Sequence, residues 1–425
     1  MTDLVNRAKL APPIGEARTE QLRRAFWFLV GAVNPFSQGQ PRADLAEIAV
    51  DWSAVYEVAA FHGVRPALYR ALCNEPAAGR YAAPLPEQLE LFQRGHTFRV
   101  MQMTSEIVAL ARTFAEADIA ALFFKGAVLA EQVYGGAQFR EFNDIDVLVA
   151  PRTQIAAEAA LERKGYLPLI PDPKLRSAFF DYLGQHIFRG VDSGTAIDLH
   201  WQFIGIGPFP IGEAEAIDSA DRLELGGIEI RVPNAETQAL ILAGHGQKEN
   251  WVSFGWVLDF AMFAAVQPNL DWESVVATAR RRKCLRPLLV AFALVERLFG
   301  HRAHSDIARK FRPRADIAAA AESITTKLEA LALKRHSEEL MGAFRLCETS
   351  MQKLQVAATL CTTPTIGDFD EMPLGPRWWW LYPATRPIRL LTRKLLGRQP
   401  RKRIWSNRDQ FLGLDRPDGN SASTK

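Results

Sequence analysis

The sequence of 425 residues contains only four cysteines, Cys73, Cys284, Cys347 and Cys361, and they form neither a C-x-x-C motif nor another metal-ligand spacing. This excludes a disulfide scaffold, and free buried thiols in a reducing cytoplasm are expected. Long apolar runs are also missing, since the longest, Pro287–Val295, is far short of the roughly 20 residues that cross a bilayer. The N-terminal residues hold no apolar segment of a secretory signal. The expected location is therefore the cytoplasm, without a membrane span.

Net charge is small as well. The 51 Lys and Arg against 48 Asp and Glu give +3, which excludes a chain that is basic throughout for binding nucleic acid. The 48% hydrophobic and 23% charged residues are typical of a soluble globular protein and exclude a disordered or collagen-like one. Acidic residues are missing from one segment, because residues 372–408 contain ten Lys and Arg and no Asp or Glu. The rest of the chain then carries a net charge of about −7.

Hydrophobic periodicity divides the chain into four parts. Apolar residues recur every three to four positions in residues 1–105 and again in 234–349, which predicts two helical regions. Between them, residues 106–233 alternate helical patterns with short apolar runs, which predicts a mixed α/β core. The expected strands are residues 120–124, 145–149, 186–189, 196–201 and 227–232, with a further one from residue 165. Residues 350–425 form a Trp- and Arg-rich basic tail, and its polar end is expected to be disordered.

Two aspartates mark the start of one expected strand. Asp144 and Asp146 are two residues apart, so their side chains point to the same face of the strand. Adjacent carboxylates repel each other unless a cation lies between them, and carboxylate oxygens suit Mg²⁺. The pair therefore indicates a metal site. The alternative is a strand that begins in solvent, where the acids serve solubility.

Upstream and downstream residues strengthen the metal interpretation. Lys125 and Gly126 join an expected strand to an expected helix, and a glycine there lets backbone N–H groups approach a phosphate. Arg140 carries a fork of donors that suits a phosphate or a carboxylate, although it is equally compatible with an ordinary surface arginine. Asp198 stands inside an apolar run, where a charge is costly unless it is paired or bound to metal. It is a candidate third carboxylate of a two-metal site, and a wet edge strand is the alternative.

Several motifs together carry a family resemblance. They are Phe124-Lys125-Gly126-Ala127-x-Leu129, Tyr134, Arg140, Asp144-Ile145-Asp146-Val147-Leu148-Val149, Asp198-Leu199-His200-Trp201, and His245-Gly246-Gln247-Lys248-Glu249-Asn250-Trp251 followed by Trp256 and Asp259. Further matches are His62-Gly63-Val64-x-Pro66-x-Leu68-Tyr69 and, downstream, Tyr382 with Arg386-Pro387-x-Arg389-Leu390. This set resembles the uncharacterised bacterial nucleotidyltransferase family of the polymerase-β-like superfamily, over about residues 40–396. The chain departs from it in lacking the superfamily's usual Gly-Ser and in having Glu249 where the family often has a second histidine.

The resemblance implies an α+β fold, with a small mixed-sheet nucleotidyltransferase core embedded between N- and C-terminal helical domains. It implies that Asp144, Asp146 and Asp198 are the catalytic and metal-binding residues, holding two Mg²⁺ ions, with Mn²⁺ as a possible substitute. An acceptor hydroxyl would attack the α-phosphorus of a bound NTP such as ATP, and pyrophosphate would leave. Asp198 would help to deprotonate that hydroxyl.

The same resemblance suggests nucleotide-binding residues. Lys125, the Gly126 backbone and Lys248 would steady the phosphates, and Arg140 would assist. His200 and His245 are candidate substrate contacts, although a histidine in such a place is more often a structural hydrogen-bond partner. His200 is the better candidate, because it shares a strand face with Asp198.

The basic segment, residues 377–403, has several interpretations. Ile388, Leu391 and Leu395 recur at helical spacing among arginines and tryptophans. An amphipathic helix of this kind suits an anionic membrane surface, here the inner face of the membrane, and arginines with aromatics also suit single-stranded nucleic acid. Alternatively, Trp378–Trp380 and the leucines pack on the helical domain while the charges are solvated.

The sequence leaves the substrate open. A small molecule, a glycan, a peptide or an RNA end fits as the acceptor of a metal-dependent nucleotidyltransferase, and the resemblance favours a small molecule or a peptide. Two alternatives from other classes are a non-catalytic nucleotide-binding protein of the same fold and a membrane-surface scaffold.

Overall fold

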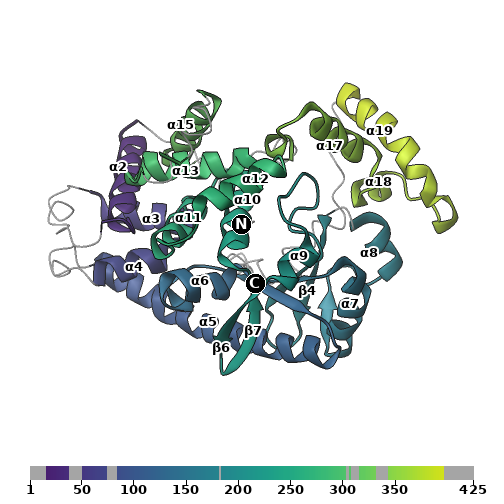
Figure 1. Cartoon of the computed structure of the whole chain (residues 1–425), viewed down its shortest axis with the longest axis horizontal. Helices are drawn as coiled ribbons and strands as arrows, with labels where there is room; N and C mark the ends of the chain where they lie inside the picture. The colour runs from purple at the N-terminus through teal and green to yellow at the C-terminus, as the bar shows by residue number, and fades with distance from the viewer. Residues whose placement is uncertain are drawn as a thin grey trace, which may run out of the picture.

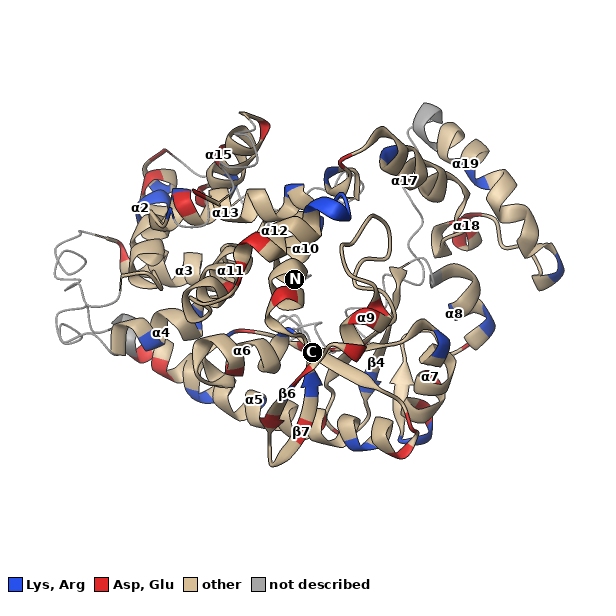
Figure 2. Cartoon of the chain, in the orientation of Figure 1, with Lys and Arg blue, Asp and Glu red and all other residues tan. Residues whose placement is uncertain are grey.

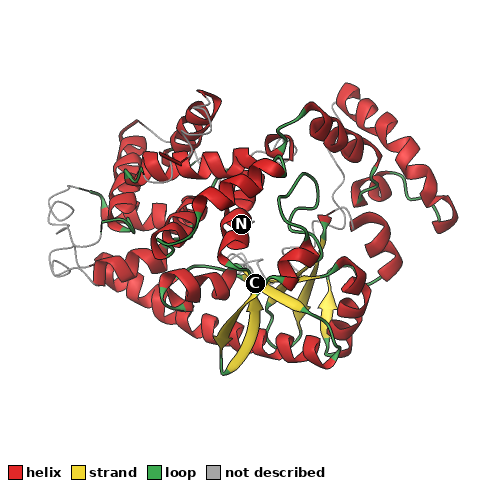
Figure 3. Cartoon of the chain, in the orientation of Figure 1, coloured by secondary structure: helices red, strands yellow, loops and turns green. Residues whose placement is uncertain are grey.

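A computed structural model describes residues 16–37, 50–73, 84–180, 183–302, 306–307, 315–331 and 343–396 (Figure 1). Parts of the expected helical regions 1–105 and 234–349, and the tail beyond residue 396, lie outside these residues. In the described part, a sheet lies against long helices, and a separate group of helices follows near the C-terminus (Figures 1 and 3). None of the described helices is both long and apolar enough to cross a membrane.

The sheet has seven strands in the order β3-β4-β5-β2-β1-β7-β6. They are β1 (Ala121–Phe124), β2 (Asp144–Val149), β3 (Tyr166–Pro168), β4 (Gln185–Gly190), β5 (Ala196–His200), β6 (Asp221–Leu225) and β7 (Ile228–Val232). β2 pairs with β5 and β1 with β7 in parallel, whereas the other pairs are antiparallel. The mixed α/β core is thus confirmed: five expected strands are present to within one residue at both ends, and the sixth, expected from residue 165, begins at Tyr166.

Burial explains which strands the sequence revealed. β1 and β2 are buried along nearly their whole length, because they lie in the middle of the sheet with neighbours on both sides. β6 lies at the edge and is mostly exposed, so its residues read as a polar loop and it was not predicted. The short helices α8 (Pro173–Phe180) and α9 (Glu213–Asp218) were missed as well, because one or two turns carry little periodicity.

The other helices before and within the sheet are α2 (Glu16–Ala32), α3 (Trp52–His62), α4 (Arg65–Cys73), α5 (Pro84–Glu116), α6 (Gly126–Tyr134) and α7 (Gln154–Arg163), with the 3₁₀ turns η3 (Ala137–Phe139) and η4 (Pro151–Thr153). After the sheet follow α10 (Ala235–Lys248), α11 (Phe254–Val266), α12 (Trp272–Arg281), α13 (Leu285–Phe299) and α15 (Ala315–Glu329). Of these helices, α5 runs along the sheet, whereas α2, α3, α11, α13 and α15 form a group beside it (Figures 1 and 3). The boundary expected at residue 105 falls inside α5, which contacts α6 and α7.

Helices from before and after the sheet share one hydrophobic core. The Phe26 ring of α2 lies edge-on to the Phe254 ring of α11 at 5.6 Å between centroids. His62, at the end of α3, is buried between them: Nδ1 accepts from the Phe254 N–H at 3.1 Å, and Nε2 lies 3.3 Å from the Leu328 carbonyl oxygen. Gly63 then ends α3 with a φ of 67°, a backbone conformation that glycine adopts without strain. The His62-Gly63 motif thus fixes the N-terminal helices to the later ones.

The C-terminal group is built on α8 of the α/β core. It comprises α17 (Ser350–Thr362), α18 (Ile366–Glu371), η6 (Pro376–Leu381) and α19 (Tyr382–Leu396). Trp379 and Tyr382 pack edge-on against Phe179 of α8 in a small core of their own. Trp378 and Trp380 are exposed instead. Of the alternative in which Trp378–Trp380 and the leucines pack on the helical domain, packing holds for Trp379, which lies against α8, and not for Trp378, Trp380 or Leu391.

The cysteine expectation holds in part. All four thiols are free, and Cys284 and Cys347 are buried, but Cys73 and Cys361 are exposed. Cys73 ends α4 and Cys361 lies near the end of α17, where each side chain reaches the protein surface.

Candidate metal and nucleotide site

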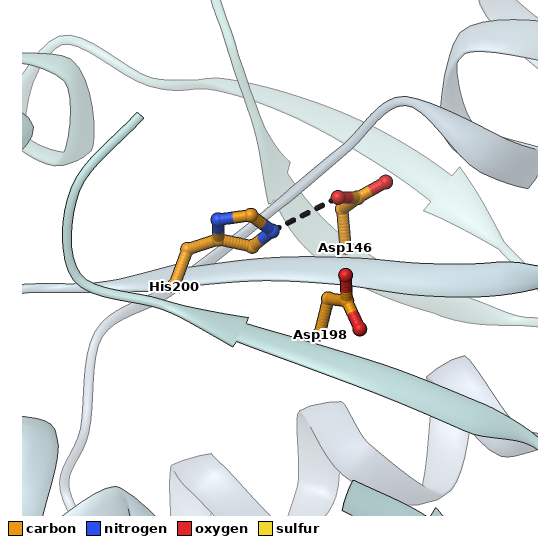
Figure 4. A group of neighbouring side chains, drawn as sticks. All are labelled: Asp146, Asp198 and His200. Carbon is orange, nitrogen blue, oxygen red and sulfur yellow. Dashed lines mark hydrogen bonds and ion pairs between the residues drawn. The ribbon is translucent and has the colours of Figure 1, made fainter. Parts of the chain in front are cut away.

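The register between two parallel strands brings the acidic residues together. Asp146 of β2 is the Cα partner of Asp198 of β5, so both side chains stand on the same face of the sheet. His200, two residues further along β5, shares that face. The potential ligand atoms of Asp146, Asp198 and His200 all lie within 4.8 Å of one another (Figure 4). Side chains from two strands therefore meet at one point.

Asp146 is the most strongly held of the three. Its Oδ1 lies 3.1 Å from the Lys125 Nζ and 2.9 Å from the His200 Nε2. Burial by itself would raise the pKa of Asp146, but the Lys125 ammonium and the His200 hydrogen bond outweigh it and hold this pKa well below its usual range. Asp146 is therefore a carboxylate, even though it is buried.

His200 donates to Asp146 through Nε2. Burial lowers the pKa of His200 despite the neighbouring carboxylate, so the ring is neutral near pH 7 and its single proton lies on Nε2. The Nδ1 atom is buried without a hydrogen-bond partner among the described residues. The Phe124 ring packs edge-on against the imidazole at 5.1 Å, which orients it. His200 thus brings one unpaired polar atom to the site, on the side of its ring away from Asp146 (Figure 4).

Asp144 lies at the start of β2, two residues before Asp146 and on the same face, and its partner on β5 is Ala196. Burial and the Asp146 carboxylate raise the pKa of Asp144, whereas the Lys125 and Arg140 cations act in the opposite direction. It stands outside the 4.8 Å group formed by the other three residues. Its charge is therefore costly in this state, and a cation that bound both aspartates would relieve the repulsion.

The turn between β1 and α6 is strained. Lys125 has φ 59° and ψ −152°, a region that is otherwise almost confined to glycine. Gly126 follows with φ 43°, and a Cβ there would lie 3.3 Å from the Asp144 carbonyl oxygen, so this position requires glycine. The Lys125 side chain does not cap α6, and the helix begins beside the carboxylates. Its first N–H groups and the Lys125 ammonium form a positive environment that suits a phosphate.

A neighbouring strand supplies a residue that the sequence reasoning missed. Gln185 of β4 donates from Nε2 to Asp198 Oδ2 at 2.8 Å. The two side chains can form this hydrogen bond because they lie close together on the adjacent antiparallel strands β4 and β5. This bond orients the half-buried Asp198 carboxylate. A glutamine just before a predicted strand gave no signal, because its partner follows from the pairing of β4 with β5.

Arg140 is paired within the protein. Its Nε and Nη2 each lie 2.8 Å from a carboxylate oxygen of Asp259 on α11, and the Tyr134 hydroxyl donates to the same carboxylate at 2.8 Å. The His96 ring contacts the Arg140 carbonyl oxygen at 2.8 Å. Two donors of the predicted phosphate fork are thus occupied, and the Arg140 charge still acts on Asp144. The pairing ties α6 and the start of β2 to α11.

The end of α10 faces the same region. Lys248 ends this helix, and its charge contributes to lowering the pKa of His200. Burial, followed by the Lys125 charge, lowers the pKa of His245 well below its usual value, and the ring packs on Trp256. Trp251 is fully buried and is therefore a core residue. The predicted residues Lys125, Gly126, Asp144, Asp146, Asp198 and His200 come together on one side of the sheet, with His245 and Lys248 nearby.

The donor set fits a divalent cation. Carboxylate oxygens of Asp146 and Asp198 are the ligands that Mg²⁺ and Mn²⁺ prefer, and His200 holds the Asp146 carboxylate beside them. Asp144 adds a further carboxylate nearby. The buried Asp146 is balanced here by Lys125, so a bound divalent cation would compete with the ammonium for the same oxygen.

A mixed sheet with carboxylates on adjacent strands and a glycine turn at a helix start defines a candidate metal-dependent phosphate-binding protein. The family described as uncharacterised nucleotidyltransferase matches residues 49–300, which is more than half of the chain. The chain belongs to this family. None of the curated proteins matches it.

Proposed function

We propose that the protein moves a nucleoside monophosphate from an NTP, such as ATP, to a hydroxyl acceptor and releases pyrophosphate. The family supports nucleotidyl transfer in general, and the group of Asp146, Asp198 and His200 within 4.8 Å carries the proposal. Two bound Mg²⁺ or Mn²⁺ ions would neutralise the charge of the triphosphate and stabilise the attacking and leaving oxygens. Asp144, Asp146 and Asp198 are the residues that we propose hold them.

The protein's own residues supply the other parts of the reaction. In the transfer step, the acceptor oxygen forms a bond to the α-phosphorus. The bond between that phosphorus and the oxygen that bridges to the β-phosphorus breaks, and pyrophosphate leaves. Asp198, oriented by Gln185, is the proposed acceptor of the hydroxyl proton. His200 holds the Asp146 carboxylate in place through its Nε2 hydrogen.

The phosphates are proposed to bind at the start of α6. Lys125 and the Gly126 backbone lie there, and Lys248 and His245 lie at the end of α10 on the same side. Positive charge and backbone N–H groups at this point would position the triphosphate, which is the main protein contribution in phosphoryl transfer. Arg140 is proposed to assist through its charge while it remains paired with Asp259.

The acceptor that we propose is a small molecule or a peptide, and a glycan or an RNA end are the other candidates. We propose the cytoplasm as the location, where NTPs are available. The helical segments on either side of the sheet are proposed to form the walls of the substrate site, since α10 and α6 both reach it.

The test is incubation of the purified full chain with each labelled NTP, a divalent metal and a cell extract. Pyrophosphate release and mass spectrometry of the protein and the extract would report NMP transfer. The variant Asp146→Asn should lower the rate by about 100-fold or more, because it removes the charge at the centre of the site. Asp221→Asn, at the exposed start of β6, is the matched control and should react like the wild type. Equal rates for wild type and Asp146→Asn would contradict the proposal.

The second candidate is a non-catalytic nucleotide-binding protein of the same fold. Lys125 in a strained conformation, where related enzymes carry Gly-Ser, is the observation in its favour. Calorimetry with a non-hydrolysable NTP and Mg²⁺ separates the two functions. Binding that depends on Asp146, without pyrophosphate release from any acceptor pool, would support the binding protein and contradict the enzyme.

A further inference from the structure

Two arginines of helix α19 point inward. Arg386 and Arg389 extend from it to Asp368 of α18, a carboxylate that is only 1% exposed, and Arg389 also binds Glu371 at 2.8 Å. Tyr382 lies on the same inner side and donates to the Met372 carbonyl oxygen at 2.6 Å. A surface helix normally buries its apolar side, whereas the inner side of α19 combines the aromatic ring of Tyr382 with two paired arginines.

From Ala384 to Leu391, the side of α19 that faces solvent is apolar. Ile388 and Leu391 are 65% and 59% exposed, and Ala384 and Pro387 are exposed beside them. Their spacing of three and four residues places all four on one side of the helix. The segment that leads into α19 adds two exposed indoles, because Trp378 of η6 is 55% exposed and Trp380 is 69% exposed. We call the set Trp378, Trp380, Ile388 and Leu391 the outer C-terminal face.

Charge around this face has one sign. Arg377 is exposed next to Trp378, and no Asp or Glu occurs in residues 372–408, whereas ten Lys and Arg do. Arg386 and Arg389 are paired with Asp368 and Glu371, Arg377 is exposed, and the other seven cations lie beyond residue 392, outside the side chains that the structure describes. Figure 2 shows the acidic residues on α18, on the inner side, and none along α19.

We propose that the outer C-terminal face binds the surface of an anionic bilayer. Tryptophans with aliphatic side chains enter the headgroup region of a membrane, and surrounding cations each contribute about 1 kcal/mol near anionic lipid. A protein partner would more often meet a face with both apolar and paired polar groups, and a nucleic acid would need arginines on the face itself, whereas Arg386 and Arg389 are paired with Asp368 and Glu371. The contact is peripheral, since none of the described helices can span a membrane. It would place the nucleotide site near the inner membrane surface.

The test is sedimentation of the full chain with phosphatidylcholine vesicles that contain about a third phosphatidylglycerol, or none. The wild type should bind the anionic vesicles and be released by about 0.5 M salt, because screening weakens the cationic contribution. The fourfold variant Trp378→Ser, Trp380→Ser, Ile388→Ser and Leu391→Ser should bind about tenfold less or weaker still. These side chains are exposed, so the fold does not depend on them.

Helix α5 offers a matched control. Leu91, Phe98 and Met101 are 74%, 73% and 67% exposed, so their replacement by serine removes a similar apolar surface elsewhere. This control variant should bind vesicles like the wild type. Equal binding by the fourfold variant, or equal loss in both variants, would overturn the proposal. A wild-type dimer that ignores vesicles, and that the fourfold variant converts to monomers, would assign the face to a second copy of the chain instead.

Discussion

The Lys125 ammonium lies 3.1 Å from a carboxylate oxygen of Asp146, and the backbone of Lys125 is strained to bring it there. The φ of 59° and ψ of −152° at Lys125 cost of order 1–3 kcal/mol in a residue with a side chain. The ion pair with the buried Asp146 compensates for part of this cost. Lys125 therefore serves as the internal counter-charge of the acidic site.

Replacing Lys125 separates strain from charge. Lys125→Ala and Lys125→Gly both remove the ammonium, but only glycine adopts the strained conformation freely. The higher entropy of glycine in the unfolded chain offsets part of the relief of strain. The free energy of unfolding of Lys125→Gly should therefore exceed that of Lys125→Ala by about 1 kcal/mol. Urea unfolding of the two variants measures this difference. If alanine proved the more stable, the backbone strain at position 125 would be refuted.

The competition between Lys125 and a divalent cation gives a second prediction. Lys125→Met removes the ammonium from Asp146, so bare Mn²⁺ should bind several-fold more tightly, whereas an NTP should bind more weakly. Titration of free Mn²⁺ by electron paramagnetic resonance measures the first effect, and calorimetry measures the second. Lys174→Met, at an exposed position of α8, is the control and should change neither. Weaker Mn²⁺ binding in Lys125→Met would show that the ammonium does not occupy the metal position.

A third prediction concerns the buried pair of Arg140 and Asp259. Asp259→Ala should lower the free energy of unfolding by about 3–5 kcal/mol, because it leaves the Arg140 guanidinium buried without its partner. The double variant Arg140→Met and Asp259→Leu should recover most of this loss, since apolar residues of similar size replace both charges. Thermal or urea unfolding measures both. A double variant as unstable as Asp259→Ala would contradict the buried-pair explanation.

The same double variant tests the proposed role of Arg140 with the nucleotide. If the Arg140 charge assists phosphate binding, the refolded double variant should bind a non-hydrolysable NTP roughly tenfold more weakly than the wild type. Unchanged binding at wild-type stability would limit Arg140 to tying α6 and β2 to α11.

The buried His62 makes stability depend on pH. Burial lowers the pKa of His62 to about 3, against about 6.5 in the unfolded chain. Between these values the unfolded state binds a proton that the folded state does not, so the contribution of His62 to stability is lost as the pH falls below 6.5. The loss from this residue is about 1.4 kcal/mol per pH unit.

His62→Asn checks this prediction. Asparagine can still accept from the Phe254 N–H but does not titrate. It should be less stable than the wild type near pH 7 by about 1–3 kcal/mol, with a shallower fall in stability between pH 6.5 and 4. Urea unfolding at a series of pH values measures the slope. The same slope in both proteins would place the proton uptake elsewhere.

The sequence predicted the centre of this fold better than its edges. The buried strands that carry Asp146 and Asp198 have continuous apolar patterns, and an acid inside such a pattern is conspicuous. β6 was missed because an exposed edge strand lacks that pattern. The resemblance included Asp259 and Tyr134, but their bonds to Arg140 depend on how α11 packs against α6, and no local signal contains this.

For helix α19, the sequence predicted the helix but not which of its sides is buried. Helical spacing correctly predicted an amphipathic helix around Ile388 and Leu391, but the direction of its apolar side depends on what charge lies underneath. That charge is Asp368, a residue in the first turn of the short helix α18 that the sequence did not single out. A periodic pattern predicts that a helix has an apolar and a polar side. Which of the two is buried depends on the element that the helix packs against.

The in-register parallel pairing of β2 with β5 has a consequence for how this family can change. Because neighbouring residues of a strand point to opposite faces, deletion of one residue between Ala196 and Asp198 would turn the carboxylate and the imidazole of β5 away from Asp146. The segment between β2 and β5 can vary in length in its loops without such an effect. A deletion of one residue in this strand would therefore abolish the site while leaving every acidic residue in the sequence. A search for the acidic residues alone would still score such a protein as having an intact site.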